Sequence, residues 1–148
     1  MVTVPCAPGG EQTEGDVPTQ VLIVDDSPLV AAVVARLIER EGYVSQAVHS
    51  GQAALEYVHE SQPDLILLDV TMPPPDGFTV CQMLKQNPAT AHIPILLLTG
   101  LDDVSASEHG QQVGANGVVT KPFNTPDLLM AMRMLLQRHA VFPPGAAD

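Results

Sequence analysis

Polar side chains follow several apolar, strand-like stretches of this sequence. The groups in question are Asp25 and Asp26 after VLIV, Asp69 after LILL, Thr99 after ILLL, and Thr120 and Lys121 after GVV. A single Asp after a strand is more often a turn residue or a helix cap than part of a site. Three carboxylates close together, however, raise one another's pKa and need positive charge beside them. Lys121 supplies one such charge, and a divalent ion with oxygen ligands, Mg²⁺, supplies two more.

A carboxylate that faces Mg²⁺ and a lysine can attack a phosphoryl group, because the cations absorb the charge on its equatorial oxygens in a loose transition state. The product would be an acyl phosphate on an Asp. Thr99 would then hydrogen-bond a phosphoryl oxygen and report the modification to the helix that follows it. Adding about two negative charges beside a bistable loop is an adequate physical switch.

The elements that must position these groups alternate along the chain. Apolar, strand-like runs separate stretches of helical period, which predicts five consecutive βα units. The expected strands are residues 21–24, 43–48, 65–68, 93–98 and 117–119. Helix starts are predicted at Ser27–Pro28 and Thr125–Pro126, where a capping side chain stands before a Pro, and at Ser50, which offers a similar cap. The apolar positions expected to face the core include Val30, Val33, Val34, Leu37 and Ile38, then Ala54, Leu55 and Val58.

The strand sequences also predict their order in the sheet. Runs 21–24, 65–68 and 93–98 are apolar on both faces, as strands buried between two helix layers must be. Run 43–48 contains Ser45 and Gln46 and run 117–119 is very short, so these two are expected at the edges. Right-handed crossovers then give a doubly wound parallel sheet of order 2-1-3-4-5, a flavodoxin-like (βα)5 α/β fold. In such a sheet the carboxyl ends of the strands bind ligands, so the polar groups should meet there.

Length and charge limit the remaining possibilities. The 148 residues suit one domain, expected over residues 20–139, with a disordered tail at 1–19 and a tail or linker start at 140–148. A net charge of -11 disfavours direct binding to nucleic acid or to anionic membranes. Two Cys make no disulfide framework or zinc site. The N-terminus resembles no signal peptide and no apolar run could span a bilayer, which predicts a cytoplasmic protein.

The chain resembles the receiver domain of two-component response regulators, through the segments VLIVDDSP, LILLDVTMPPPDGF, ILLLTG and VVTKPF. By that resemblance Asp69 is the phosphoacceptor, and Asp25, Asp26 and Asp69 hold Mg²⁺ together with the backbone carbonyl of Thr71. Thr99 is the switch hydroxyl and Lys121 contacts the phosphoryl group. Lys121–Pro122 matches a position where the family has a cis peptide bond.

The resemblance also implies partners. The phosphoryl group would come from the phosphohistidine of a sensor histidine kinase or a histidine phosphotransfer protein. The changed surface around the fourth helix, fifth strand and fifth helix would act on a separate output partner or effector domain, with a weak homodimer possible. We expect no effector domain in this chain, which is therefore either a protein that docks on a partner or a piece of a longer one.

The sequence departs from the usual family pattern at several positions. Val118 stands where the family often has an aromatic ring that turns inward on phosphorylation, so that ring movement is not expected here. Gly100 follows the switch threonine where Ala is common. Thr71 and Leu101 stand where side chains overhang the phosphoryl group and should affect its lifetime.

Two other functions remain open. Asp69, Val70 and Thr71 form the D-x-T that resembles the nucleophile motif of haloacid-dehalogenase-type phosphohydrolases. A receiver-shaped module that works without phosphorylation is the other. The remaining chemistry-bearing residues predict no further site: Cys81 falls within the third helix, the Met130, Met132 and Met134 cluster is expected to fill the core, and the histidines, at no metal-ligand spacing, are expected to be solvated. These histidines are His49, His59, His92, His109 and His139.

Overall fold

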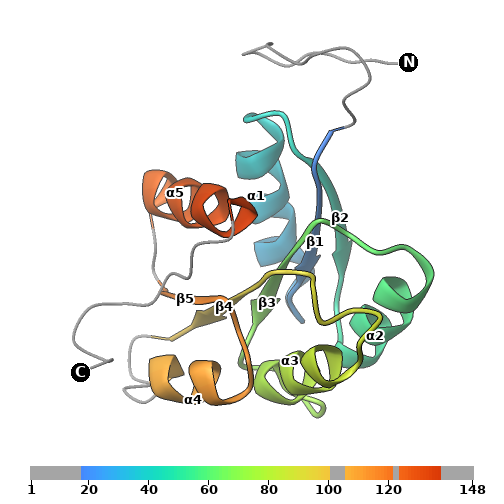
Figure 1. The fold of residues 1–148 in the computed structure, drawn as a ribbon. Coiled ribbons are helices and arrows are strands. Elements are labelled where there is room, and N and C mark those ends of the chain that lie inside the picture. Colours follow the sequence, from blue (N-terminus) through green and yellow to red (C-terminus); the bar gives the residue numbers. More distant parts are fainter. Residues whose placement is uncertain (1–17, 101–105, 122–123, 138–148) are drawn as a thin grey trace.

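The structure is a computed structural model that describes residues 18–100, 106–121 and 124–137. Within these residues the chain forms five strands that alternate with five helices (Figure 1). The strands are β1 (Gln20–Val24), β2 (Val44–Val48), β3 (Leu65–Asp69), β4 (Ile95–Thr99) and β5 (Gly117–Thr120). The helices are α1 (Pro28–Glu39), α2 (Gly51–Glu60), α3 (Gly77–Gln86), α4 (Ala106–Gln112) and α5 (Thr125–Leu136).

The strands pair in parallel in the order β2-β1-β3-β4-β5. Helices α1 and α5 cover one face of this sheet, and α2, α3 and α4 cover the other (Figure 1). The predicted flavodoxin-like fold and strand order are confirmed, and the predicted strands agree with the observed bounds to within two residues.

Side chains of the inner strands alternate between two buried clusters among the described residues. Leu22, Val24, Ile66 and Leu68 point into the cluster under α2, α3 and α4. Val21, Ile23, Leu65 and Leu67 point into the cluster under α1 and α5. Because both faces are covered, β3 and β4 are buried at every position, which is why their sequences are apolar throughout.

The edge strands differ from the inner ones as predicted. In β2, Val44 and Gln46 are exposed and the other positions are only partly buried. Strand β5 is short, with Gly117 and Val118 buried and the next two residues partly buried. An edge strand has one neighbour and thinner helix cover, which tolerates polar residues such as Ser45 and Gln46.

Helix starts follow the predicted caps at two places and differ at a third. The hydroxyl oxygens of Ser27 and Ser50 accept hydrogen bonds from the N–H groups of Val30 and Ala53, at 3.3 and 3.1 Å. For α5 the predicted cap, Thr125, is wrong: Asn124 is the cap, and its Oδ1 accepts a hydrogen bond from the N–H of Asp127 at 2.8 Å. Asn is the stronger capping residue, so the helix begins one residue earlier.

The inward face of α1 also differs from the prediction. The buried residues are Ala31, Val34 and Ile38. Val30 and Val33, predicted to face the core, are exposed. Each precedes a buried residue by one position, a rotation of about 100° around the helix, so the two valines lie beside the buried stripe.

Several predictions fall on residues that the structure does not describe. They concern the two tails, His139, Leu101 and the Lys121–Pro122 bond, which lie wholly or partly outside the described residues. Among the described residues, Pro74–Pro75 is a cis peptide bond. None of the described helices has the length and apolar character that crossing a bilayer requires.

Candidate functional site

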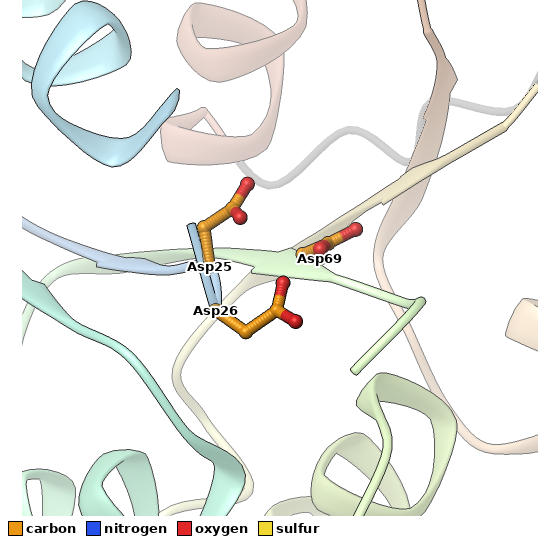
Figure 2. Close-up of side chains that lie close together, drawn as sticks. All are labelled: Asp25, Asp26 and Asp69. Carbon is orange, nitrogen blue, oxygen red and sulfur yellow. The ribbon is translucent and has the colours of Figure 1, made fainter. Parts of the chain in front are cut away.

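Three carboxylates meet at the carboxyl ends of β1 and β3. Asp25, Asp26 and Asp69 each offer an oxygen atom, and these atoms lie within 4.8 Å of one another. Figure 2 shows the three side chains grouped where the two strands end. Asp25 and Asp69 are buried, whereas Asp26 is exposed.

The sheet itself brings these residues together. In the parallel register of β1 and β3, Val24 pairs with Leu68, so the next residues, Asp25 and Asp69, lie side by side at the carboxyl edge of the sheet. The polypeptide cannot separate the two carboxylates without breaking the register of the two central strands.

Lys121, directly after β5, reaches across the same end of the sheet. Its Nζ lies 3.3 Å from Oδ1 of Asp69 and 3.6 Å from Oδ2 of Asp25. Its backbone N–H donates to the carbonyl of Thr99, the last residue of β4, at 2.6 Å. One ammonium group among three carboxylates leaves two negative charges uncompensated within the cluster.

The pKa of the Asp69 carboxyl is raised above its ordinary value. Burial is the main cause, because a buried carboxylate loses solvation by water. Lys121 opposes this increase, and the carboxylate of Asp25 adds to it. A further hydrogen bond, from the N–H of Thr71 to Oδ1 of Asp69 at 3.3 Å, favours the ionised form.

These residues fit a hard divalent cation. The donors are oxygens only, they converge from two strand ends, and the charge left uncompensated matches that of Mg²⁺. A cation there would also offset the desolvation that raises the pKa of Asp69. The donor set is therefore suited to Mg²⁺.

Asp25 is held at each of its polar groups. Its N–H donates to the carbonyl of Val48 at 3.1 Å, and its Oδ1 accepts from the N–H of Ser27 at 2.9 Å. Nδ1 of His49 lies 3.0 Å from the carbonyl oxygen of Asp25. His49 is exposed, as predicted, but this contact was not predicted. The available signal was its place directly after β2, the one strand end at which no site residue was predicted.

The peptide after Asp69 is in close contact with the start of α3. Asp76 caps this helix, its Oδ1 accepting from the N–H of Thr79 at 2.9 Å, and Gly77 donates its N–H to the carbonyl of Val70 at 3.1 Å. A side chain at Gly77 would place its Cβ 2.6 Å from Cα of Val70. The lack of a side chain at Gly77 therefore lets α3 begin against the backbone that follows Asp69.

Thr99, the predicted switch residue, ends β4 and is buried. In the register of β4 and β5 it pairs with Thr120, the residue before Lys121, so it belongs to the same end of the sheet. The Thr71 side chain is exposed and Gly100 is partly buried.

Helix α4 packs closely on α3 and β5. The His109 ring stacks on Phe78 of α3, with ring centroids 3.8 Å apart and an angle of 16° between the rings. Val118, which stands at the position of the family's aromatic residue, is buried beneath Gly110 of α4. His109 is exposed, as predicted, but its stack was not predictable because Phe78 comes from another helix.

The Cys81 thiol is buried in α3, away from the strand ends, as predicted. Burial raises its pKa to about 12, so the thiol is protonated at neutral pH. Met132 is buried, Met134 is partly buried and Met130 is exposed, in agreement with a cluster that mostly fills the core.

This fold and this arrangement of acids and lysine define a class of signalling domain. Residues 21–133 match the family described as the response regulator receiver domain, and the chain belongs to this family. The resemblance to the receiver domain of two-component response regulators, noted from the sequence, is thus confirmed.

Individual relatives support the same assignment. The chain is 39% identical over 127 residues to the DNA-binding dual master transcriptional regulator RpaA of Synechocystis sp., covering 86% of this chain and 53% of that protein. It is 38% identical over 129 residues to response regulator MprA of Mycobacterium ulcerans, covering 87% of this chain and 55% of that protein. The chain thus spans about half the length of these curated relatives.

A solved structure gives the same result for the fold. The signal receiver domain of a signal transduction histidine kinase from Syntrophus aciditrophicus is 35% identical, with a TM-score of 0.76. The match covers 81% of this chain and 91% of that one. Receiver domains of this shape therefore occur both in response regulators and in a histidine kinase.

Proposed function

We propose that this chain is a phosphoacceptor switch in which Asp69 receives a phosphoryl group from the phosphohistidine of a sensor histidine kinase or a histidine phosphotransfer protein. One observation carries the proposal: the buried carboxylate of Asp69 lies at a strand end beside two further carboxylates, with Nζ of Lys121 at 3.3 Å. A phosphoryl group on Asp69 would place its negative charge next to Lys121 and to a cation held by the carboxylates.

In the proposed transfer, a carboxylate oxygen of Asp69 attacks phosphorus. The P–O bond forms as the P–N bond of the phosphohistidine breaks, and the imidazole nitrogen keeps the electron pair of that bond. Bound Mg²⁺, held by Asp25, Asp26, Asp69 and the backbone carbonyl of Thr71, would supply neutralising charge for the phosphoryl oxygens. Lys121 contributes its own positive charge beside Asp69.

After the transfer, Thr99 and Lys121 would bind phosphoryl oxygens. Their strand ends lead into α4 and α5, so the surface of α4, β5 and α5 is the proposed output face. Val118 cannot supply the ring movement of an aromatic side chain. We therefore expect the change at this face to involve the packing of α4 on β5.

The surface beside the pocket supports a protein as the phosphodonor. Helix α1 begins two residues after Asp26 and exposes Leu29, Val30 and Val33, the first of them at 75%. Exposed apolar side chains on one helix favour contact with another protein surface. A donor that brings its phosphohistidine to Asp69 would cover this part of α1.

The same proposal includes the bounds of the domain, its location and its partners. The receiver domain comprises residues 20–139, with tails on either side, and acts in the cytoplasm. Its output is exerted through a separate partner or an effector domain, and a weak homodimer is compatible with this role. The net charge of -11 argues against direct contact of the domain with nucleic acid or with a membrane.

Intact-mass measurement tests the central step. We expect one phosphoryl group per chain on exposure to acetyl phosphate with Mg²⁺, and none in EDTA. Asp69→Asn should abolish the labelling, whereas Glu60→Gln, which alters an exposed acid at the last residue of α2, the end of that helix opposite the pocket, should label normally. Equal labelling of Asp69→Asn would reject Asp69 as the acceptor.

The same reaction separates the alternatives. Sustained release of phosphate from small phosphate esters, over many turnovers, would favour a phosphohydrolase of the haloacid-dehalogenase type. A chain that takes no label from acetyl phosphate or from any phosphohistidine donor would favour a module that works without phosphorylation.

A further inference from the structure

His49 connects the end of β2 to the acidic pocket. Its Nδ1 lies 3.0 Å from the carbonyl oxygen of Asp25. A carbonyl oxygen only accepts hydrogen bonds, so Nδ1 carries a proton and donates it. The contact joins residues 24 positions apart and attaches the loop after β1 to the end of the neighbouring edge strand, β2.

The atom that His49 holds belongs to the peptide group between Asp25 and Asp26. This peptide is planar, so fixing its carbonyl also fixes the direction in which Asp26 leaves the loop. The N–H on the other side of Asp25 is held by the carbonyl of Val48, the residue before His49. Two consecutive residues at the end of β2 thus fix the backbone on both sides of Asp25.

Asp25 and Asp26 depend on this backbone to different degrees. The Asp25 carboxylate is also held directly, by the N–H of Ser27 at 2.9 Å and by Lys121 at 3.6 Å. The Asp26 carboxylate is exposed, and within the described part of the chain no side chain or backbone group donates a hydrogen bond to it. Its place in the cluster is therefore set by the backbone that carries it.

We propose that His49 is a positioning residue for the cation site: its hydrogen bond to the Asp25 carbonyl orients the Asp25–Asp26 peptide so that the Asp26 carboxylate faces Asp25 and Asp69. His49 touches neither the phosphoryl group nor the ion in this role and acts through the backbone of the two acids. This inference rests on the proposed function, since it takes the acids to be Mg²⁺ ligands.

The test is a titration of the full chain with MgCl₂, followed by the amide NMR signals of residues 25–27. His49→Ala should weaken Mg²⁺ binding about fivefold, which is within the contribution of a single hydrogen bond. His49→Asn places an amide N–H near the position of Nδ1 and should restore most of the affinity. His59→Ala, which removes an exposed histidine from the far end of α2, is the matched control and should bind as the unaltered chain does.

A kinetic measurement distinguishes positioning from loss of structure. The Mg²⁺ concentration for half-maximal labelling by acetyl phosphate should rise about fivefold in His49→Ala, whereas the rate at saturating Mg²⁺ should change little. Equal Mg²⁺ affinity in His49→Ala and the unaltered chain would overturn the inference and leave the proposed function intact. So would a failure of His49→Asn to bind more tightly than His49→Ala. An unaltered chain that binds no Mg²⁺ would instead overturn the proposed function, and this inference with it.

Discussion

Gly110 of α4 lies so close to Val118 of β5 that a Cβ at Gly110 would stand 2.8 Å from Cγ2 of Val118 and 3.2 Å from Cδ1 of Leu97. Helix α4 therefore sits on the sheet at a distance that only a glycine permits. The residue beneath it is the one that stands in place of the family's aromatic side chain. The seating of α4 on this face is thus set by Gly110 and Val118 together.

Gly110→Ala should destabilise the domain, although Gly to Ala within a helix usually stabilises it. The added methyl group overlaps Val118, and such overpacking costs about 1–3 kcal/mol of the free energy of unfolding. Urea denaturation measures this cost. In a Val118→Ala background the cost of Gly110→Ala should largely disappear, and an equal cost in both backgrounds would contradict the packing described for α4.

Lys121→Met should slow phosphorylation and tighten Mg²⁺ binding. The ammonium group lies 3.3 and 3.6 Å from two of the carboxylates, so its removal leaves more negative charge for the cation to neutralise. The same removal takes away a positive charge that stabilises the transferring phosphoryl group, at a cost of about 100-fold in rate. Labelling kinetics and Mg²⁺ titration measure the two effects. Arg133→Met, an exposed cation of α5, should change neither.

Asp69→Asn should stabilise the metal-free domain at neutral pH. The folded-state pKa of Asp69 is raised mainly by burial, so folding favours the protonated carboxyl. The stability that this group contributes is present below its ordinary pKa of 3.8 and is lost as the pH rises through the folded-state value. In EDTA, the Tm of Asp69→Asn should exceed that of the unaltered chain by about 3 °C at pH 7. The difference should shrink towards pH 4, and a difference independent of pH would contradict the raised pKa.

Val33→Glu should impair phosphotransfer from a protein donor and leave labelling by acetyl phosphate unchanged. Val33 is 52% exposed on α1, and a charge there would have to be buried by a docking protein but not by a small donor. We expect a loss of about tenfold or more in the rate of transfer from the cognate kinase. Met83→Glu is the matched control, since Met83 is exposed to a similar degree, 48%, on α3 in the opposite helix layer. Equal transfer to Val33→Glu and the unaltered chain would remove α1 from the proposed docking surface.

The sequence predicts the sheet well because strand order follows from simple physics. Strands buried on both faces must be apolar throughout, and parallel strands that run in one direction end at one edge. The proximity of Asp25, Asp69 and Lys121 could therefore be predicted from the sequence alone. Which residues of a helix face the core is harder to predict when two sets of residues have the same spacing. On α1, Val30 and Val33 have the same spacing as the buried Ala31 and Val34, so periodicity alone could not select the inward stripe.

Side-chain contacts between elements that are distant in the sequence were also not predicted. The ring of His49 meets the Asp25 carbonyl because β2 pairs with β1, and the ring of His109 meets Phe78 because α3 and α4 share a face of the sheet. The only signal for the His49 contact is its place directly after β2, and nothing in the sequence indicates the stack of His109. At the start of α5, Asn124 and Thr125 are both suitable caps, and their capping preferences differ too little for the sequence alone to decide between them.

The division between strands and strand ends also affects how such a domain can diverge. The residues proposed to handle the phosphoryl group end a strand or follow one within a few residues, whereas the apolar packing lies within the strands and on the inward faces of the helices. Substitutions beyond the strand ends can therefore alter signalling kinetics or recognition at little cost to folding. An evolving lineage could acquire new timing and new associates while its interior stays the same.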